Sequence, residues 1–446
     1  MATLSSPEHK LFEELAPPLT RAEALVEADR CLECGGPYAE APCVTACPAG
    51  VDVPAFVTAI ARDDAQTAAK TIFAENLLGA TCARVCPVET LCEGACVLLH
   101  ERRRAVEIGR LQRFATDAAL EAGLPLRHCR PRNWYPVAVI GAGPAGLTCA
   151  GELAVLGFEV TVYDERVDPG GLARFAIAPY RQQREPLPKE VRALEQLGVK
   201  FEFGLAIDTP EALAYVESFN EAVVLAVGMG PDADAAYPGD DLPGVWNSLP
   251  FIEAIKTGEI PDIGSSVAVI GGGNTAIDVA RESLRLRAEE VTLVYRRTRS
   301  EMPAYEHEVE EALEEGMRIE WLTVPLRFVG SASLEGVLCR RCRLGEPDAT
   351  GRRKPQEMPG TEFLLPVTAA VKAIGQRPRS ELYAHIAGLE LENGRIKIDP
   401  ESGQTTNPKY FSAGDATNGG ATVVEAVRGA KLAAFGVDQW VGRRRR

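Results

Sequence analysis

The chain has 446 residues, of which 46% are hydrophobic, so it is long enough to bury the cores of several domains. Its formal net charge of −15 argues against a surface that binds nucleic acid or anionic membrane. No apolar run reaches the roughly 18 residues that a membrane span needs. The stretch from Met1 to Glu14 is polar and charged and lacks the apolar centre of a signal sequence. We therefore expect a cytoplasmic protein without a nucleic-acid or membrane partner.

Cysteine is concentrated near the N-terminus, where eight of the twelve cysteines precede position 97. A reducing cytoplasm disfavours disulfides, and such crowding in a large intracellular chain is typical of metal sites. The spacing is Cys31-x2-Cys34, Cys43-x3-Cys47-Pro, Cys86-Pro, Cys92 and Cys96. A proline directly after the last cysteine of a run is typical of bacterial ferredoxins, in which the odd cysteine of each run serves the other cluster. The spacing therefore favours two four-iron clusters.

Zinc and purely structural thiols are the alternatives. Zinc ribbons prefer paired Cys-x2-Cys knuckles, and this region holds one such pair. Cys82 is one cysteine more than two clusters need, and the isolated Cys129 and Cys149 are predicted to be packing residues. Cys339 and Cys342 also have Cys-x2-Cys spacing, but they fall in a predicted strand without a second pair.

Helical patterns surround the cysteines. Thr20 followed by Glu23 fits a capping box ahead of a short helix. The stretch from Val53 to Leu78 is helix-forming and shows no turn cluster, and the stretch from Arg104 to Leu120 has apolar residues on one stripe. We expect residues 1–130 to form an all-α domain that binds two [4Fe-4S] clusters.

After a linker at 123–135 the period changes. A strand at 137–140 leads into Gly141-x-Gly143-x-x-Gly146, a helix, and a second strand that ends at Asp164. Glycines in this context allow a tight turn, close approach of a pyrophosphate and helix–strand packing. Asp164 is placed to accept hydrogen bonds from a ribose; the alternative is an ordinary turn aspartate.

The same pattern returns about 130 residues later. A strand at 267–270 precedes Gly271, Gly273 and Ala276, and the next strand ends at Arg296 and Arg297. Two such units predict two doubly wound domains. Guanidinium groups in place of an acidic residue suit a 2′-phosphate, so the sequence favours NADPH over NADH. The alternative is a basic surface pair that tolerates either nucleotide.

The remaining elements are too few for another domain. They are an acidic helix at 306–315, a strand-rich stretch to Glu362, a strand at 366–375, a strand ending at Gly414 and Asp415, and a small-residue helix at 422–435. We expect an α/β chain in which residues 135–250 plus 366–446 form a discontinuous FAD-binding domain and residues 251–365 bind NAD(P). This arrangement is typical of flavin reductases, in which hydride transfer to the flavin depends on alignment and needs no general base.

With these residues in view, the chain resembles a known family between about Leu11 and Val441. It is similar to the electron-input small subunit of bacterial dihydropyrimidine dehydrogenase and to the small subunit of NADPH-dependent glutamate synthase. The stretches that carry the resemblance most specifically are 78–87, 91–96 and 108–114, and the first and third lean toward the pyrimidine enzyme.

The resemblance implies a ligand set for each cluster and a set of contacts for each cofactor. One cluster would be bound by Cys31, Cys34, Cys43 and Cys96, and the other by Cys47, Cys86, Cys92 and the side-chain oxygen of Gln112. The implied FAD contacts are Asp164, Leu172, Arg181, Gly414, Asp415, Thr422 and Val423. The implied NADP contacts are Gly273, Asn274, Thr275, Arg296, Arg297 and Gly375. The sequence departs from the family in a longer gap between Cys34 and Cys43 and in Ala176-Ile177-Ala178, where relatives carry Gly-Ile-Pro.

The expected function is that of an electron-donor subunit in a hetero-oligomer. Electrons would pass from NADPH to FAD, through the two clusters, and on to a larger catalytic subunit of the flavin-barrel or amidotransferase type. Reduction of uracil and thymine is the favoured downstream reaction, with glutamate synthesis as the alternative. A stand-alone NADPH oxidoreductase that reduces a ferredoxin-like carrier, and a redox-sensing module without turnover, are further hypotheses.

Overall fold

The structure, a computed structural model, describes residues 12–36, 38–347 and 353–444. These residues form two compact units. Unit 1 comprises 12–13, 175–180 and 230–377, and unit 2 comprises 14–174, 181–229 and 378–444. Within the described ranges, no helix is both long enough and apolar enough to cross a membrane. The predictions that concern residues 1–11 lie outside this part of the chain.

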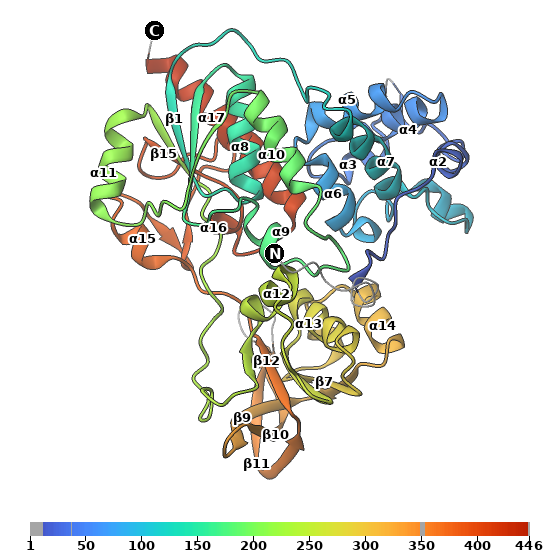
Figure 1. The fold of residues 1–446 in the computed structure, drawn as a ribbon, viewed down its shortest axis with the longest axis vertical. Coiled ribbons are helices and arrows are strands. Elements are labelled where there is room, and N and C mark those ends of the chain that lie inside the picture. The colour runs from blue at the N-terminus through green and yellow to red at the C-terminus, as the bar shows by residue number, and fades with distance from the viewer. Residues whose placement is uncertain (1–11, 37, 348–352, 445–446) are drawn as a thin grey trace. The chain divides into compact units, whose positions relative to one another are not determined.

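Unit 2 begins with a bundle of short helices (Figure 1). They are α2 (Arg21–Ala28), α3 (Pro42–Thr45), α4 (Val53–Ala61), α5 (Ala65–Glu75), α6 (Gly79–Val85), η2 (Val88–Thr90), η3 (Val97–Glu101) and α7 (Ile108–Glu121). The predicted capping box opens α2: the Thr20 amide donates to the Glu23 carboxylate at 2.8 Å, and the Glu23 amide donates to the Thr20 hydroxyl at 3.3 Å.

The prediction that 53–78 contains no turn is wrong. The stretch forms two helices, because the chain leaves the helical path after Ala61 and Asp63 adopts a left-handed φ of 62°. Asp64 then accepts a hydrogen bond from the Thr67 amide at 2.9 Å and caps α5. Asp64, as the N-cap of α5, thus marks the break between α4 and α5.

The second part of unit 2 is a parallel sheet in the order β15-β4-β1-β2-β3. Its strands are β1 (Pro136–Ile140), β2 (Glu159–Asp164), β3 (Lys200–Phe203), β4 (Ala222–Leu225) and β15 (Tyr410–Ser412). Its helices are α8 (Pro144–Val155), α9 (Gly171–Phe175), α10 (Leu187–Gln196), α11 (Pro210–Phe219), α15 (Ser380–Ala384), α16 (Asp415–Asn418) and α17 (Val423–Arg444), and β13 (Leu391–Glu392) pairs with β14 (Arg395–Ile396). Figure 1 shows α8, α10 and α17 together beside this sheet, with α11 on its far side.

Unit 1 holds a second parallel sheet, in the order β5-β12-β6-β7-β8. Its strands are β5 (Val245–Asn247), β6 (Ser266–Gly271), β7 (Glu290–Tyr295), β8 (Arg318–Trp321) and β12 (Ala369–Ala373), and its helices are α12 (Ser248–Thr257), α13 (Asn274–Arg285), η4 (Arg299–Glu301) and α14 (Glu306–Glu314). The prediction that the strand at 366–375 returns to the first sheet is wrong. β12 is fully buried between β5 and β6, where its buried Lys372 pairs with Asp240.

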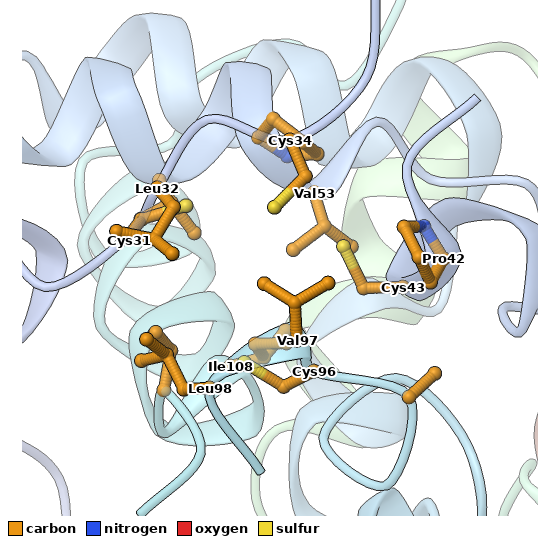
Figure 2. Close-up of a pocket in the computed structure, with 14 residues that line it drawn as sticks. Cys31, Leu32, Cys34, Pro42, Cys43, Val53, Cys96, Val97, Leu98 and Ile108 are labelled. Atoms are coloured by element: carbon orange, nitrogen blue, oxygen red, sulfur yellow. The ribbon is translucent and has the colours of Figure 1, made fainter. Parts of the chain in front are cut away.

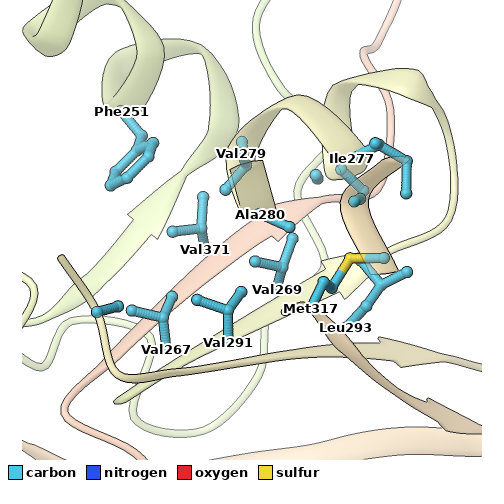
Figure 3. Close-up of a cluster of buried hydrophobic side chains, with 14 of the residues drawn as sticks. Phe251, Val267, Val269, Ile277, Val279, Ala280, Val291, Leu293, Met317 and Val371 are labelled. Atoms are coloured by element: carbon cyan, nitrogen blue, oxygen red, sulfur yellow. The ribbon is translucent and has the colours of Figure 1, made fainter. Parts of the chain in front are cut away.

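Each face of this second sheet has its own core. Val269, Val291 and Val371 of the sheet pack with Phe251 of α12 and Val279 of α13, as Figure 3 shows. The opposite face is covered by an antiparallel sheet of β9 (Thr323–Gly330), β10 (Leu334–Pro347) and β11 (Arg353–Pro366), whose Val337 and Phe328 are buried against Ile270. The α/β fold with two doubly wound parallel sheets and an N-terminal helical part is confirmed.

Candidate functional site

Four of the predicted cluster cysteines surround one hollow. Figure 2 shows the sulfur atoms of Cys31, Cys34, Cys43 and Cys96 pointing toward a common space. Apolar side chains such as Val53 line the rest of the hollow. The four cysteines come from the loop after α2, the short helix α3 and the residue before η3, so the fold gathers thiols that span 66 positions of sequence.

The spread of these thiols fits a cluster better than one ion. Within the described ranges, no three histidine, cysteine, aspartate or glutamate side chains gather as tightly as one metal ion requires. A zinc ion lies about 2.3 Å from each of its sulfur ligands, so it would need the thiols closer together. Four thiols in an apolar shell are the usual surroundings of an iron–sulfur cluster. Burial raises the pKa of the Cys31 thiol, and it raises the pKa of Cys43 to about 11.

The remaining predicted cysteines form a second group. A hydrogen bond with Cys82, burial, and the neighbouring Cys92 and Cys47 all raise the pKa of the Cys86 thiol. Burial is also the main cause of the raised pKa of Cys92, and Cys47 adds to it. Cys47, Cys86 and Cys92 therefore lie within electrostatic reach of one another, and Cys43 of the first group also adds to the raised pKa of Cys92.

Gln112 lies on α7, which packs beside α6. Its amide nitrogen donates a hydrogen bond of 2.7 Å to the carbonyl oxygen of Gly79. This bond directs the nitrogen to the backbone of α6, so the side-chain oxygen is the end left for other contacts. The geometry fits the predicted role of that oxygen as a cluster ligand.

The other cysteines divide by burial. Cys149, Cys339 and Cys342 are buried, and the last two lie on β10, as the sequence analysis expects. The prediction that Cys129 is a packing residue is wrong, because its side chain is exposed. It follows α7 in the segment that leads to β1, where the chain runs along the surface of unit 2.

The first glycine loop joins β1 to α8. A side-chain carbon at Gly146 would lie 1.8 Å from the Gly141 carbonyl oxygen, and one at Gly141 would lie 2.4 Å from the Ala226 oxygen. Both glycines are therefore required by the packing of the loop itself. A carbon at Gly143 would meet only the Gly171 α-carbon, at 3.9 Å, so this glycine faces open space at the start of α8. A pyrophosphate at that helix start would receive free backbone amides.

Asp164 ends β2 beside this loop. Its carboxylate accepts hydrogen bonds from the amides of Ala142, at 2.6 Å, and Arg166, at 2.8 Å. The two bonds fix the carboxylate and leave each oxygen able to accept another donor. The structure therefore contains the turn contact that we name as the alternative, and it is compatible with the ribose contact as well.

The remaining predicted flavin contacts lie on three segments of unit 2. Leu172 lies in α9 and Arg181 in the segment between α9 and α10, and both residues are partly buried. Gly414 has a left-handed φ of 73°, and burial raises the pKa of Asp415, which accepts a hydrogen bond from the Ala421 amide. Thr422 and Val423 open α17, where the Thr422 hydroxyl accepts a hydrogen bond from the Glu425 amide.

The second glycine loop joins β6 to α13 and repeats the first. A side-chain carbon at Gly271 would lie 2.2 Å from the Ala373 oxygen, whereas none at Gly273 would meet any atom within 4 Å. The third glycine position holds Ala276, which is buried. Gly272 is required too, because a carbon there would lie 2.3 Å from the Tyr295 ring, a constraint that the sequence analysis did not identify. The open position again stands at a helix start.

The side chains around this loop differ in their hydrogen bonds and in their exposure. Asn274 accepts a hydrogen bond of 2.9 Å from the Tyr305 amide, while Thr275 is exposed. The Arg297 guanidinium donates to the Arg353 carbonyl oxygen at 3.0 Å. The Arg296 side chain is exposed at the end of β7, and its guanidinium makes no hydrogen bond or ion pair with the described residues.

Gly375 lies just beyond β12, at the same end of the sheet. Its φ is 102°, and a side-chain carbon at this position would meet no atom within 4 Å. Like Gly273, it therefore leaves open space for a ligand beside the carboxyl ends of the strands.

Two polar contacts join the helical bundle of unit 2 to its sheet. Glu190 of α10 accepts hydrogen bonds from α6, and Lys431 of α17 donates to the Ala49 carbonyl oxygen at 2.9 Å and to the Glu75 carboxylate at 2.6 Å. The partners are 109 or more positions apart, and a lone charged residue on a helix carries no signal of such a contact. The sequence analysis therefore missed both residues.

Comparison with known proteins matches the two parts of the chain separately. Residues 8–124 match the family described as "Dihydroprymidine dehydrogenase domain II, 4Fe-4S cluster". Residues 135–430 match the family described as "Pyridine nucleotide-disulphide oxidoreductase". The solved structure of FprA from Mycobacterium tuberculosis in complex with NADPH is 21% identical, with a TM-score of 0.58, and covers 71% of this chain and 86% of that one, which shows a shared fold.

Two curated relatives match almost end to end. The glutamate synthase [NADPH] small chain of Halomonas elongata is 35% identical over 96% of this chain and 93% of its own length. The protein of the same name from Escherichia coli K12 is 34% identical over 96% of this chain and 94% of its own length. These matches confirm the prediction of an NAD(P)H-dependent oxidoreductase with FAD and 4Fe-4S clusters. The chain belongs to the family of pyridine nucleotide-disulphide oxidoreductases with an N-terminal 4Fe-4S domain that includes the small chains of NADPH-dependent glutamate synthase.

Proposed function

We propose that this chain is an electron-input subunit that oxidises NADPH at FAD and passes single electrons through two [4Fe-4S] clusters to a larger catalytic subunit. The observation that carries the proposal is the hollow bounded by four cysteine thiols in the same unit as the Gly141–Gly146 loop. When bound, FAD accepts a hydride and releases its electrons one at a time, which iron–sulfur clusters can accept.

The residues of the chain would position these groups and exclude water from them. Cys31, Cys34, Cys43 and Cys96 would bind one cluster inside the apolar hollow. Cys47, Cys86, Cys92 and the Gln112 side-chain oxygen would bind the other. A neutral amide in place of a thiolate lowers the negative charge around that cluster, which shifts its reduction potential.

The flavin would lie along the carboxyl ends of the unit 2 strands, where the open face of Gly143 admits its pyrophosphate. Asp164 would bind the ribose. The remaining contacts would come from Leu172, Arg181, Gly414, Asp415, Thr422 and Val423.

NADPH is the proposed hydride donor, and Arg296 supports this choice. An exposed guanidinium at the end of the second strand, with no hydrogen bond or ion pair to the described residues, suits a 2′-phosphate. Gly273 and Gly375 leave space for the rest of the nucleotide, and Asn274 and Thr275 begin the helix that would meet its pyrophosphate. Arg297 is the second predicted contact, although its guanidinium already binds the Arg353 carbonyl oxygen.

Contacts within unit 2 support an order for the two thiol groups. Lys431 of the sheet's last helix binds the carbonyl oxygen of Ala49, two residues after Cys47, and Glu190 binds α6, which ends before Cys86. The second group is thus the one contacted from the flavin-binding fold. The loop of the first group is open to solvent at Leu32, whose side chain is 53% exposed. Electrons would enter at the second group and leave at the first.

The proposed partner is an amidotransferase-type large subunit. Our sequence analysis favours a pyrimidine-reducing partner, but both near-full-length relatives described above are small chains of glutamate synthase. The comparisons therefore favour the glutamate synthase alternative.

The choice of partner is testable by reconstitution. The purified chain would be mixed in turn with a glutamate synthase large subunit and with a flavin-barrel pyrimidine reductase, and NADPH oxidation would be followed without oxygen. We expect oxidation that depends on glutamine and 2-oxoglutarate with the first partner, and none that depends on uracil with the second. Uracil-dependent oxidation alone would reverse the assignment, and rapid reduction of a small ferredoxin without either partner would favour the stand-alone oxidoreductase.

A further inference from the structure

α6 lacks the usual cap at its N-terminus. The N-cap residue is Leu78, whose side chain makes no capping hydrogen bond. The first amides of a helix have no partner inside the helix, and leaving them unpaired in a buried position is costly. α6 is buried here: Gly79, Ala80 and Thr81 are all buried, so water does not reach these amides.

A carboxylate from another part of the chain supplies the missing cap. Glu190 Oε1 accepts hydrogen bonds from the Ala80 amide at 2.9 Å and the Thr81 amide at 3.0 Å, and Oε2 accepts one from the Thr81 hydroxyl at 2.5 Å. Glu190 is fully buried, with a relative exposure of 0%. Burial raises the pKa of Glu190 to about 7, while its hydrogen bonds from Thr81 and Ala80 oppose this rise. The helix dipole also favours the ionised form at this end of the helix.

The surrounding contacts are apolar and tight. A side-chain carbon at Gly151 of α8 would lie 2.5 Å from Leu77 and 2.6 Å from Leu194 of α10. The backbone of α8, the helix behind the flavin loop, therefore packs directly on the residues that precede α6 and on the helix that carries Glu190. Leu194 lies one turn after Glu190 on α10, so the Glu190 hydrogen bonds lie beside a closely packed contact.

The capped helix leads to two of the proposed ligands. Cys86 is its C-cap residue, and the Gly79 carbonyl oxygen at its first turn holds the Gln112 amide nitrogen at 2.7 Å. A shift of α6 would therefore move both the Cys86 thiol and the oxygen of Gln112. Neither contact depends on a residue of the first thiol group.

We propose that Glu190 is a positioning residue for electron transfer, which holds α6, and through it Cys86 and Gln112, in a fixed place relative to the flavin-binding sheet. This inference rests on the proposed function. Its physical basis is that the rate of electron transfer between two centres falls as their separation grows, so a displaced α6 would slow the transfer.

The test uses the complete holoenzyme, prepared without oxygen and mixed rapidly with NADPH. Flavin bleaching reports hydride transfer, and the iron–sulfur absorbance together with the electron paramagnetic resonance of freeze-quenched samples reports cluster reduction. Amide hydrogen exchange at 79–85 reports whether α6 is held. The variants are Glu190→Ala, Glu190→Gln, which keeps the shape and an accepting oxygen, and Thr81→Ala, which removes only the hydroxyl contact. Glu195→Ala on the exposed side of the same helix is the control.

In Glu190→Ala, we expect the 79–85 amides to exchange faster and the resonance of one cluster to change. Its clusters should be reduced about tenfold more slowly, while flavin bleaching stays within about twofold of wild type. Glu190→Gln should restore both signals, and Thr81→Ala should fall between Glu190→Ala and wild type. If Glu190→Ala does not fold, the Thr81→Ala and Glu190→Gln results decide. The inference would be overturned if Thr81→Ala and Glu190→Ala showed the amide exchange, resonance and cluster reduction of wild type. It would also be overturned if flavin bleaching slowed as much as cluster reduction. Failure of wild-type protein to reduce its clusters with NADPH would instead contradict the proposed function.

Discussion

Arg296 is the residue on which nucleotide choice is expected to depend. Its exposed guanidinium makes no hydrogen bond or ion pair with the described residues, whereas its neighbour Arg297 binds a backbone carbonyl oxygen. A hydrogen-bonded charge pair with a 2′-phosphate contributes about 1.5–3 kcal/mol. NADH lacks this phosphate, so it gains nothing from the guanidinium.

Arg296→Ala should therefore raise the KM for NADPH by about 10- to 100-fold and leave the KM for NADH unchanged. The measurement is flavin reduction with each nucleotide in turn. Arg318→Ala is a matched control, because Arg318 begins β8, where it pairs with Glu290 on the surface. An equal loss with both nucleotides in Arg296→Ala would show that the residue does not read the 2′-phosphate.

Cys82 and Cys86 are neighbouring thiols, of which Cys86 is the proposed cluster ligand and Cys82 the spare. It is buried on α6, four residues before Cys86, and the hydrogen bond between the two raises the pKa of Cys86. If Cys86 is the ligand, Cys82→Ala should keep the full iron content and lose only about 1 kcal/mol of stability to the small cavity. Cys86→Ala should lose about half of the iron, since one of two four-iron clusters would be missing. Iron and sulfide analysis distinguishes them, and iron loss in Cys82→Ala with none in Cys86→Ala would exchange their roles.

In both glycine loops, outer glycines are required by packing and the middle glycine leaves space for a ligand. At the outer glycines Gly141, Gly146 and Gly271, a side-chain carbon would lie within 2.4 Å of a backbone oxygen, whereas the middle positions, Gly143 and Gly273, face open space. Both middle glycines have negative φ, so alanine is compatible with the backbone. Their lack of a side chain therefore serves a ligand and not the fold.

Gly143→Ala should fold with an unchanged unfolding temperature in the absence of FAD and bind FAD at least about tenfold more weakly, because its methyl group would occupy the space of the pyrophosphate. Gly273→Ala should do the same for NADPH alone. Gly442→Ala near the end of α17, where a side-chain carbon also meets no atom within 4 Å, is the control. Unweakened FAD binding in Gly143→Ala would place the pyrophosphate elsewhere.

The pair of helices α13 and α14 carries a pH-dependent contact. Burial raises the pKa of Glu315, but hydrogen bonds from Arg285 and Arg281 outweigh it and lower the pKa to about 2. Arg281 is only 2% exposed, and its guanidinium also lies 4.9 Å from the centre of the Tyr180 ring. A carboxyl with a lowered pKa stabilises the fold above its ordinary pKa, and this contribution disappears as the pH falls toward 2.

Glu315→Gln should therefore lower the free energy of unfolding of unit 1 by about 2 kcal/mol at neutral pH. The difference from wild type should shrink between pH 4.5 and pH 2, the range set by the ordinary and the lowered pKa. Thermal unfolding of both proteins across this range measures it. Glu314→Gln, on the same turn, should unfold like wild type at every pH; a difference for Glu315→Gln that grew at low pH would contradict the assignment.

Across the whole molecule, local patterns predicted more than long-range contacts did. The capping box at Thr20, both strand–glycine–helix units and the Cys31–Cys34 pair depend on spacings of a few residues, and the structure contains all of them. The sheet that contains 369–373 cannot be predicted locally, because a mostly apolar strand fits any buried position and one of its partners lies about 100 residues away. Glu190 could not be predicted, because a helix cap supplied from 109 residues away leaves no local pattern.

In the proposed function, electrons cross from the flavin-binding sheet of unit 2 into its helical bundle. The contacts of Glu190 and Lys431 join these two parts, and the bundle provides the seven thiols and the Gln112 oxygen that would bind iron. The decisive measurement uses protein purified without oxygen and reduced with NADPH alone. Electron paramagnetic resonance is recorded, and iron, sulfide and flavin are counted in the same sample. The account predicts about eight iron atoms per FAD and the resonance of reduced [4Fe-4S] clusters on addition of NADPH. Zinc at these thiols, or a flavin that bleaches while the iron–sulfur signal stays absent, would contradict it.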